Sequence, residues 1–259
     1  MKKYAFITGS SSGIGKAMAF ELAAMGYCPI LHGRNHHALT EVKKLIEGKY
    51  KDLECETLIA NLSEPNETEN LIKKLSLFNI EVFISNAGFG IPGNFEATDI
   101  ANEEEMISTH VTSVVKLSKY FYQNFAKKEK GYILNTSSLY SYFPVPKQSM
   151  YGATKAFQHS FFLALHQEAR LNLPHIFISS LCPGLTYSNF RISQGKKEKK
   201  SVVGMEASAV AKIAINGLFK NKAVIVPGVF GKMMAFVIPK LPIGIQLSII
   251  YNMNKQRGF

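Results

Sequence analysis

A short apolar segment, a glycine-rich turn and a helical pattern follow one another at the start of the chain. Residues 3–8 predict a buried strand, and residues 9–15 then hold three glycines before apolar side chains recur at helical spacing. Gly9 permits a tight turn, Gly13 lets a phosphate approach the backbone, and Gly15 lets the helix pack close to the strand. The amides at the helix N-terminus would face that anion. A plain strand-to-helix turn is the alternative interpretation.

The alternation of apolar segments continues along most of the chain. After the first unit we expect strands at 28–32, 53–60, 81–85, 131–136, 176–181 and 223–226, and helices at 38–48, 64–78, 101–128, 149–171 and 206–219. Strands that alternate with helices are typical of a parallel sheet covered by helices on both faces. The sequence therefore predicts a Rossmann-type, doubly wound α/β fold of about seven strands. We expect a single domain over 1–259, with an apolar C-terminal extension over 229–259.

Small and polar residues stand where these strands end. Gly13, Asn86, Ser138 and Pro183 all follow directly after predicted strands, at the edge where such sheets bind ligands. The second strand leads to Arg34, at the place where an acid would bind a ribose 2′-hydroxyl. A guanidinium suits a 2′-phosphate instead, which predicts about a 10- to 100-fold preference for NADP over NAD. A solvated loop charge is the alternative.

A tyrosine and a lysine stand four residues apart within the predicted helix at 149–171. Tyr151 and Lys155 would share one face of that helix and project side by side. A free phenol has a pKa of about 10, and a fixed cation beside it stabilises the phenolate. Lowering the pKa of Tyr151 by about three units needs about 4 kcal/mol. This spacing is common by chance, so the pair alone is weak evidence of catalysis.

Taken in order, these residues resemble the short-chain dehydrogenase/reductase superfamily over about residues 3–230. The resemblance rests on five motifs: the Thr8–Gly15 turn, Asn86-Ala87-Gly88, Ser138 thirteen residues before Tyr151, Lys155, and Pro183-Gly184. The apolar, basic tail after Val226-Pro227-Gly228 is similar to the subgroup that includes 3-oxoacyl and steroid-type reductases. The resemblance implies an NADP(H)-dependent enzyme that interconverts a ketone, aldehyde or 3-oxoacyl carbonyl and an alcohol by hydride transfer.

The resemblance also implies roles for single residues. Tyr151 would be the general acid/base, Lys155 would lower its pKa and hold the nicotinamide ribose, and Ser138 would orient the carbonyl. Ser137 is the neighbouring alternative to Ser138, and no metal is implied. The implied cofactor-binding residues are Gly9, Ser11, Ser12, Gly13, Ile14, Gly15, Arg34, Asn61, Leu62, Asn86, Ala87, Gly88, Tyr151, Lys155, Pro183, Gly184 and Thr186.

Two positions depart from the family pattern. His110 stands where the family usually has an asparagine that helps to hold a water leading to the lysine. The histidine would either hold that water or relay protons as a further catalytic residue, or it would be a satisfied interior histidine. Asn61 replaces an aspartate near the adenine, which it can still pair with. A non-catalytic NADP-binding regulatory or scaffold protein on the same fold is the rival function.

The net charge of +11 is concentrated near the C-terminus. Residues 191–259 hold 12 basic and 2 acidic side chains, and no acid follows Glu206. Residues 188–205 are predicted to form a substrate lid, whose lysines would attract an anionic acyl thioester or would simply be solvated. Residues 229–251 are apolar but interrupted by prolines, too short for the ~20 residues that span a bilayer. Packing on the pocket or on a second subunit is preferred to lying on a membrane.

The remaining expectations concern partners and location. The partner is a small-molecule carbonyl or alcohol, and the resemblance implies a homodimer or homotetramer. The basic tail is not interleaved with aromatic side chains in a nucleic-acid motif, so no nucleic acid is expected. Cys28, Cys55 and Cys182 are sparse and lack metal-ligand spacing. Together with the absence of a signal-peptide pattern at the start of the sequence, they predict a cytoplasmic protein.

Overall fold

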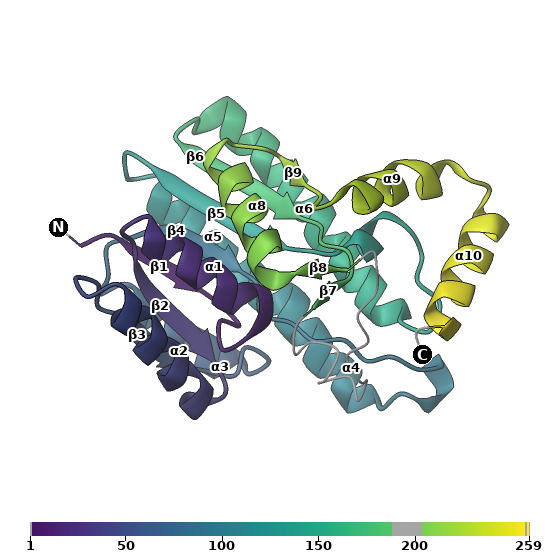
Figure 1. The fold of residues 1–259 in the computed structure, drawn as a ribbon, viewed down its shortest axis with the longest axis horizontal. Coiled ribbons are helices and arrows are strands. Elements are labelled where there is room, and N and C mark those ends of the chain that lie inside the picture. The colour runs from purple at the N-terminus through teal and green to yellow at the C-terminus, as the bar shows by residue number, and fades with distance from the viewer. Residues whose placement is uncertain (1, 188–203, 257, 259) are drawn as a thin grey trace.

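A parallel sheet forms the centre of the computed structural model, which describes residues 2–187, 204–256 and 258 (Figure 1). Its strands follow the order β3-β2-β1-β4-β5-β6-β9, and every neighbouring pair is parallel. Their bounds are β1 Tyr4–Ile7, β2 Cys28–Gly33, β3 Glu56–Ile59, β4 Ile80–Ser85, β5 Gly131–Thr136, β6 Ile176–Leu181 and β9 Val224–Ile225. The order reverses between β1 and β4, which opens a crevice at the carboxyl ends of the strands. The predicted seven-stranded Rossmann-type fold is confirmed.

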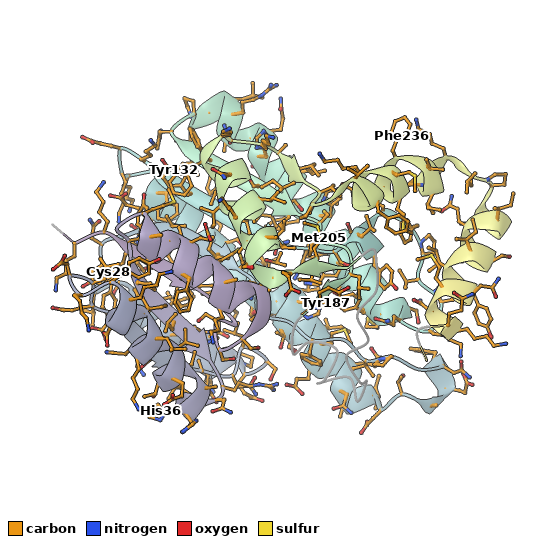
Figure 2. The ribbon with its side chains drawn as sticks, viewed as in Figure 1. Cys28, His36, Tyr132, Tyr187, Met205 and Phe236 are labelled. Carbon is orange, nitrogen blue, oxygen red and sulfur yellow. The ribbon has the colours of Figure 1, made fainter. Side chains whose placement is uncertain are left out.

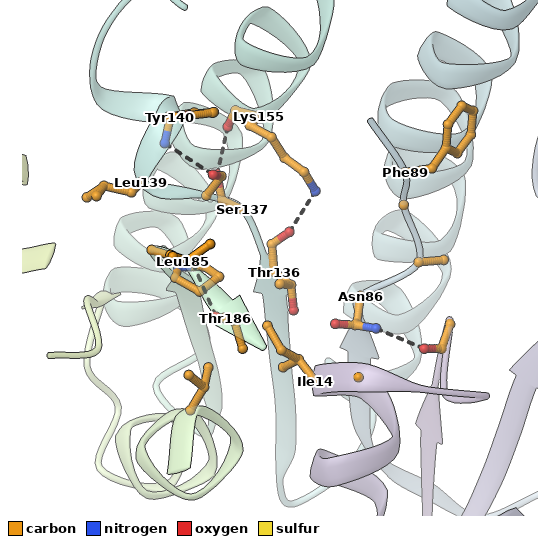
Figure 3. Close-up of a pocket in the computed structure, with 18 of the residues that line it drawn as sticks. Ile14, Asn86, Phe89, Thr136, Ser137, Leu139, Tyr140, Lys155, Leu185 and Thr186 are labelled. Carbon is orange, nitrogen blue, oxygen red and sulfur yellow. Dashed lines mark hydrogen bonds between the residues drawn. The ribbon is translucent and has the colours of Figure 1, made fainter. Parts of the chain in front are cut away.

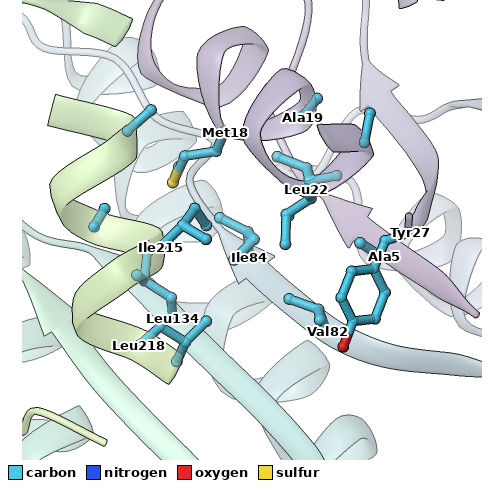
Figure 4. Packing of buried hydrophobic residues seen from close by; sticks show 14 of the residues in the cluster. Ala5, Met18, Ala19, Leu22, Tyr27, Val82, Ile84, Leu134, Ile215 and Leu218 are labelled. Atoms are coloured by element: carbon cyan, nitrogen blue, oxygen red, sulfur yellow. The ribbon is translucent and has the colours of Figure 1, made fainter. Parts of the chain in front are cut away.

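Helices cover both faces of the sheet. One face carries α1 Gly13–Ala24, α2 His36–Lys49 and α8 Ala207–Phe219, and the other carries α3 Pro65–Leu75, α5 Ser113–Phe125 and α6 Ser149–Asn172. Met18 and Leu22 of α1 pack with Ile215 and Leu218 of α8 over Ile84 of β4 (Figure 4). Each such side chain is completely or almost completely buried, and this layer fixes α1 against the strand that precedes it.

The single helix expected over 101–128 is present as one continuous run of helical residues over 100–125, but a π-helical segment breaks its α-helical geometry. Helix α4 (Ile100–Ile107) runs into a π-helical segment, η2 (Ser108–Thr112), and then into α5. A π turn rotates the side chains that follow it relative to those before it, and such turns often lie at functional sites. The segment contains neither glycine nor proline, so the sequence pattern gave no sign of the break. It places His110 in the interior.

The C-terminal extension forms a separate pair of helices at one end of the molecule (Figure 1). Its elements are α9 Val229–Val237, the 3-10 turn η4 Ile238–Lys240 and α10 Ile243–Gln256. Their inner sides pack on residues 139–145, which include the 3-10 turn η3 Leu139–Tyr142. The Tyr140 hydroxyl donates to Asn254 Oδ1 at 2.6 Å, and Asn254 Nδ2 donates to Pro146 O at 2.8 Å. The extension is therefore tied to the sheet domain.

The predicted lid lies largely outside the described residues, which resume at Gly204. Its two flanks meet in a small parallel sheet between β7 (Thr186–Tyr187) and β8 (Met205–Glu206). A short 3-10 turn, η1 Phe95–Ala97, follows β4. Among the helices that the structure describes, none is both long and apolar enough to cross a bilayer.

Candidate active site

A cavity of about 770 Å³ opens at the carboxyl ends of the strands (Figure 3). Most of the residues predicted from the sequence line it: Gly9, Ser11, Ser12, Gly13, Ile14, Arg34, Asn61, Leu62, Asn86, Ala87, Gly88, Ser138, Tyr151, Lys155, Pro183, Gly184 and Thr186. Gly15 and His110 lie behind this lining, in contact with residues that form it. The segments that meet here are distant in sequence, and the parallel sheet brings their ends together.

The glycine-rich turn is shaped by its backbone and held by β4. Gly9 and Gly13 have φ values of 66° and 56°, which favour glycine. A Cβ on Gly9 would lie 2.8 Å from the Cα of Ala87, so the turn passes too close to the next segment for any side chain. Asn86 Nδ2 donates to Thr8 O and Gly9 O at 3.1 Å each. Asn86 therefore holds the turn in shape, and α1 begins at Gly13 with its N-terminus at the cavity.

Arg34 follows β2 and is paired across the cavity rim. Its Nη1 lies 2.6 Å from Glu105 Oε1 on α4, and the guanidinium side chain is 62% exposed. An anion at Arg34 would have to share this cation with Glu105. The exposed pair itself contributes about 1 kcal/mol or less to stability, so a doubly charged phosphate can displace the carboxylate.

Tyr151 and Ser138 face each other on one wall of the cavity. Both are largely buried and both line it. The two side chains are hydrogen-bonded, which alone would lower the pKa of the Tyr151 phenol. Burial acts more strongly and in the opposite direction, so the pKa of Tyr151 lies above its usual range in this structure. This direction is opposite to the acidification expected from Lys155, and it favours the protonated phenol.

Lys155 is turned toward backbone and amide oxygens as well as toward the tyrosine. Its Nζ donates to Thr136 O at 2.9 Å (Figure 3). It also donates to Gln158 Oε1 at 3.0 Å and lies 5.8 Å from the centroid of the Tyr151 ring. Burial lowers the pKa of the Lys155 ammonium to about 7. Gln158 Nε2 donates to His110 O at 2.8 Å, so a side-chain amide links the lysine to the π-helical segment.

Both ring nitrogens of His110 have a hydrogen-bond partner. Its Nε2 accepts the backbone N–H of Phe89 at 3.0 Å, so a neutral ring carries its proton on Nδ1. That Nδ1 lies 3.0 Å from Thr154 Oγ1, which in turn donates to Tyr151 O. Burial holds the pKa of His110 well below its ordinary value. His110 therefore fits a satisfied interior histidine. Its backbone carbonyl, and not its imidazole ring, is linked to Lys155, because Gln158 bonds both.

Gln158 was not singled out from the sequence, although its spacing carried a signal. It stands three residues after Lys155 on α6, which places both side chains on the same side of the helix. Tyr140 and Gln148 were also missed, and both line the cavity. Their segment, 139–148, had no regular pattern to indicate that it folds back over the site.

The burial of Lys155 predicts a pH-dependent stability. Its pKa is 10.5 when exposed and about 7 when folded, so between these values the unfolded chain binds more protons and stability rises with pH. Relative to Lys155→Met, the ligand-free wild type should gain about 2 kcal/mol of unfolding free energy from pH 7 to about pH 9. Urea unfolding of both proteins across this window measures the difference. Parallel curves would show that Lys155 titrates normally in the folded state.

Comparisons with known proteins agree with this arrangement of motifs. The family model for short chain dehydrogenase matches residues 3–199. The human very-long-chain 3-oxoacyl-CoA reductase is 29% identical over 258 residues, covering 98% of this chain and 80% of the reductase. Human 17-beta-hydroxysteroid dehydrogenase type 3 is 33% identical over 187 residues, covering 71% and 59% of the two chains. A short-chain dehydrogenase from Sphingobium yanoikuyae, solved with NADPH, has a TM-score of 0.79 at 26% identity and covers 88% of this chain and 89% of its own.

Proposed function

This chain belongs to the short-chain dehydrogenase family, and on that premise we propose that it is an NADP(H)-dependent carbonyl reductase with Tyr151 as its general acid/base. The family makes it an oxidoreductase that interconverts a carbonyl and an alcohol with a nicotinamide cofactor. The proposal adds the cofactor preference, the residue roles and a ketone, aldehyde or 3-oxoacyl substrate. The observation that carries it is the grouping of Ser138, Tyr151 and Lys155 on one wall of the cavity.

The cavity fits a dinucleotide at its glycine-rich end. The turn leaves no room for a side chain at Gly9, has positive φ at Gly9 and Gly13, and ends at the N-terminus of α1, which is the environment a pyrophosphate requires. Arg34 and Asn61 would hold the adenosine half, and Lys155 the nicotinamide ribose. Pro183, Gly184 and Thr186 would contact the carboxamide, with Ser11, Ser12, Ile14, Leu62, Ala87 and Gly88 completing the contact surface. The bound nicotinamide supplies the hydride.

The chain itself supplies orientation and a proton. The Ser138 hydroxyl donates a hydrogen bond that orients the substrate carbonyl, and Tyr151 gives its phenolic proton to the carbonyl oxygen as the alcohol forms. Since burial keeps the Tyr151 phenol protonated, the residue is in the correct state for reduction before substrate arrives. Lys155, held by Thr136 O and Gln158, places a cation beside the phenolate that proton transfer leaves behind.

The alternative, a regulatory or scaffold protein that binds NADP without turnover, fits the cavity less well. Such a protein would need the glycine-rich turn but no lysine buried beside a tyrosine. Keeping the ammonium of Lys155 almost completely buried is unfavourable, as the lowered pKa shows. A buried group whose pKa is strongly shifted within a cavity favours catalysis.

Arg34 supports the preference for NADP, and its pairing with Glu105 refines the expectation. A 2′-phosphate would take the guanidinium from Glu105 and would lie near that carboxylate. Arg34→Ala should therefore lower the NADP-to-NAD ratio of kcat/KM by about 10- to 100-fold. Glu105→Gln should raise the same ratio, because it removes the competing negative charge.

Turnover of NADPH and NADH with a ketone and with a 3-oxoacyl thioester tests both parts of the proposal. Wild-type protein should oxidise NADPH with at least one of these carbonyls, and the two variants should shift the cofactor ratio in opposite directions. An unchanged ratio in Arg34→Ala would show that Arg34 is only a surface charge. Cofactor binding without turnover by the wild type would favour the scaffold alternative.

Two further features bear on substrate and setting. Leu139, Met234 and Met253 form an apolar part of the cavity wall, which suits a carbonyl compound with a hydrocarbon portion. The activity named for the human 3-oxoacyl-CoA reductase supports an acyl substrate. All three cysteines are buried free thiols. A cytoplasmic location and a homodimeric or homotetrameric assembly stay predictions.

A further inference from the structure

Helix α9 is apolar on its outer side as well as its inner side. Val229, Met233, Phe236 and Val237 are 84%, 53%, 65% and 44% exposed, and their spacing places them on one side of the helix. Figure 2 shows Phe236 pointing away from the body of the molecule. A soluble surface helix normally turns polar residues outward, and a helix that is apolar all round is normally buried in something.

Helix α10 adds exposed apolar side chains along one flank, beside its buried residues. Ile243, Leu247 and Tyr251 recur every four residues and are 59%, 37% and 44% exposed. Ile250 and Asn254 stand three residues after Leu247 and Tyr251, and this adjoining side of the helix is buried against the sheet domain. We call the exposed residues Val229, Met233, Phe236, Val237, Ile243, Ile245, Leu247 and Tyr251 the outer face. Exposed apolar groups gathered in this way mark an interaction surface.

The charges beside the outer face all have one sign. Lys232, Lys240 and Lys255 are exposed on these elements, and the sequence has no acid after Glu206. Lys240 Nζ lies 3.2 Å from the centroid of the Phe236 ring, so cation and apolar surface are in direct contact. An apolar helix face bordered by lysines is the arrangement that binds at the surface of an anionic bilayer.

The outer face is continuous with the mouth of the cavity. Val229 belongs to both, since it lines the cavity while being 84% exposed. Phe230, the next residue, also lines the cavity and is 38% exposed. An apolar substrate dissolved in lipid could therefore pass along α9 into the cavity without crossing water.

We propose that the outer face of α9 and α10 docks on an anionic lipid bilayer and admits lipid-dissolved carbonyl substrates to the cavity. The substrate part rests on the proposed reductase function, and the docking part does not. A second copy of this chain is a less suitable occupant, because a symmetric contact would bring lysines against lysines with no acid on these helices to pair them.

Vesicle co-sedimentation of the full chain tests the docking. Wild-type protein should bind phosphatidylcholine vesicles containing phosphatidylserine at least tenfold more tightly than pure phosphatidylcholine vesicles, and added salt should weaken the binding. Met233→Ser with Phe236→Ser, and separately Lys232→Glu with Lys240→Glu, should each lower the binding to anionic vesicles by at least about tenfold. None of these four side chains lines the cavity as the structure describes it.

Matched variants elsewhere on the surface provide the controls. Leu77→Ser with Leu171→Ser removes two apolar side chains that are 82% and 69% exposed, and Lys73→Glu with Lys119→Glu makes the same change in net charge. Both should bind anionic vesicles as the wild type does. Equal loss in the controls, or wild-type protein that stays off anionic vesicles, would overturn the docking. The docking would also be overturned if the wild type formed a dimer in solution and only the Met233→Ser, Phe236→Ser variant were monomeric.

Turnover separates this proposal from the reductase function. Each outer-face variant should reduce a short water-soluble ketone at the wild-type rate, but should lose rate on a long-chain 3-oxoacyl thioester presented in anionic vesicles. A variant that no longer binds vesicles but reduces the vesicle-bound thioester at the wild-type rate would overturn the proposed access route and leave the docking proposal standing. Wild-type protein that reduces neither substrate would instead remove the reductase function, whatever its vesicle binding.

Discussion

Tyr151→Phe should lower kcat for carbonyl reduction by about 10³-fold or more while NADPH affinity stays unchanged. The substitution removes only the phenolic proton donor, and a positioned general acid contributes about 10²- to 10⁴-fold. The larger part of this range applies because burial keeps the phenol neutral and Ser138 holds it in place. The phenyl ring still fills the same volume, so the cavity wall should keep its shape.

Steady-state turnover and NADPH titration measure the two halves of this expectation. Tyr140→Phe is the matched control, because Tyr140 also lines the cavity but its hydroxyl is used to bind Asn254. That control should lose stability and keep most of its kcat. A Tyr151→Phe protein that stays active, or one that no longer binds NADPH, would remove Tyr151 from the role of proton donor.

Ser138→Ala should lower kcat by about 10²- to 10³-fold, the effect of removing one donor to a developing oxyanion. Ser138 lines the cavity and is hydrogen-bonded to Tyr151, so the substitution removes the carbonyl's second donor and loosens the phenol. Ser137→Ala is the comparison that the sequence itself suggests. The Ser137 hydroxyl donates to Lys155 O at 2.8 Å, and this bond joins the residue that follows β5 to the backbone of α6.

Rates at saturating substrate distinguish the two serines. Ser138→Ala should lose kcat with little change in NADPH affinity, whereas Ser137→Ala should chiefly lower the unfolding free energy by about 1 kcal/mol. The reverse order, with Ser137→Ala inactive and Ser138→Ala active, would transfer the carbonyl contact to Ser137.

The fold could be predicted because its evidence is local in the sequence. The spacing of apolar residues predicts each strand and the helix that follows it, and glycines such as Gly9 and Gly13 mark the turn between them. The right-handed connection of such units then determines how the strands are arranged in the sheet. The break at Ser108–Thr112 could not be predicted, because a π turn has no breaker residue to mark it. The segment places the ring of His110 against Gly88, where a Cβ would lie only 2.6 Å from His110 Nε2.

The membership of the cavity was predictable, but its electrostatics were not. A strand end indicated Ser138, helical spacing indicated Tyr151 and Lys155, and the family resemblance placed the three together; in the structure all three line the cavity. The direction of the Tyr151 pKa shift depends chiefly on burial, which a spacing of four residues does not reveal. The contact of Lys155 Nζ with Thr136 O is likewise absent from the sequence pattern. The pairing of Arg34 with Glu105 spans 71 positions and is likewise a product of packing.

The C-terminal extension shows the same limit. The sequence offered packing on the pocket, on a second subunit or on a membrane as alternatives. The structure shows the first, because Met234, Ile238 and Ile250 pack on the η3 segment. It also leaves apolar side chains exposed on the outside of these helices. The sequence could not distinguish them from the buried ones, because both belong to one apolar segment.

The central claim is that neutral Tyr151 gives the proton that completes carbonyl reduction in this cavity. The most direct measurement is a single turnover, in which wild-type and Tyr151→Phe proteins saturated with NADPH are mixed with excess carbonyl substrate. We predict that the wild type oxidises its bound NADPH and releases alcohol, while the variant retains NADPH unoxidised over the same period. Equal rates of oxidation in the two proteins would contradict the account.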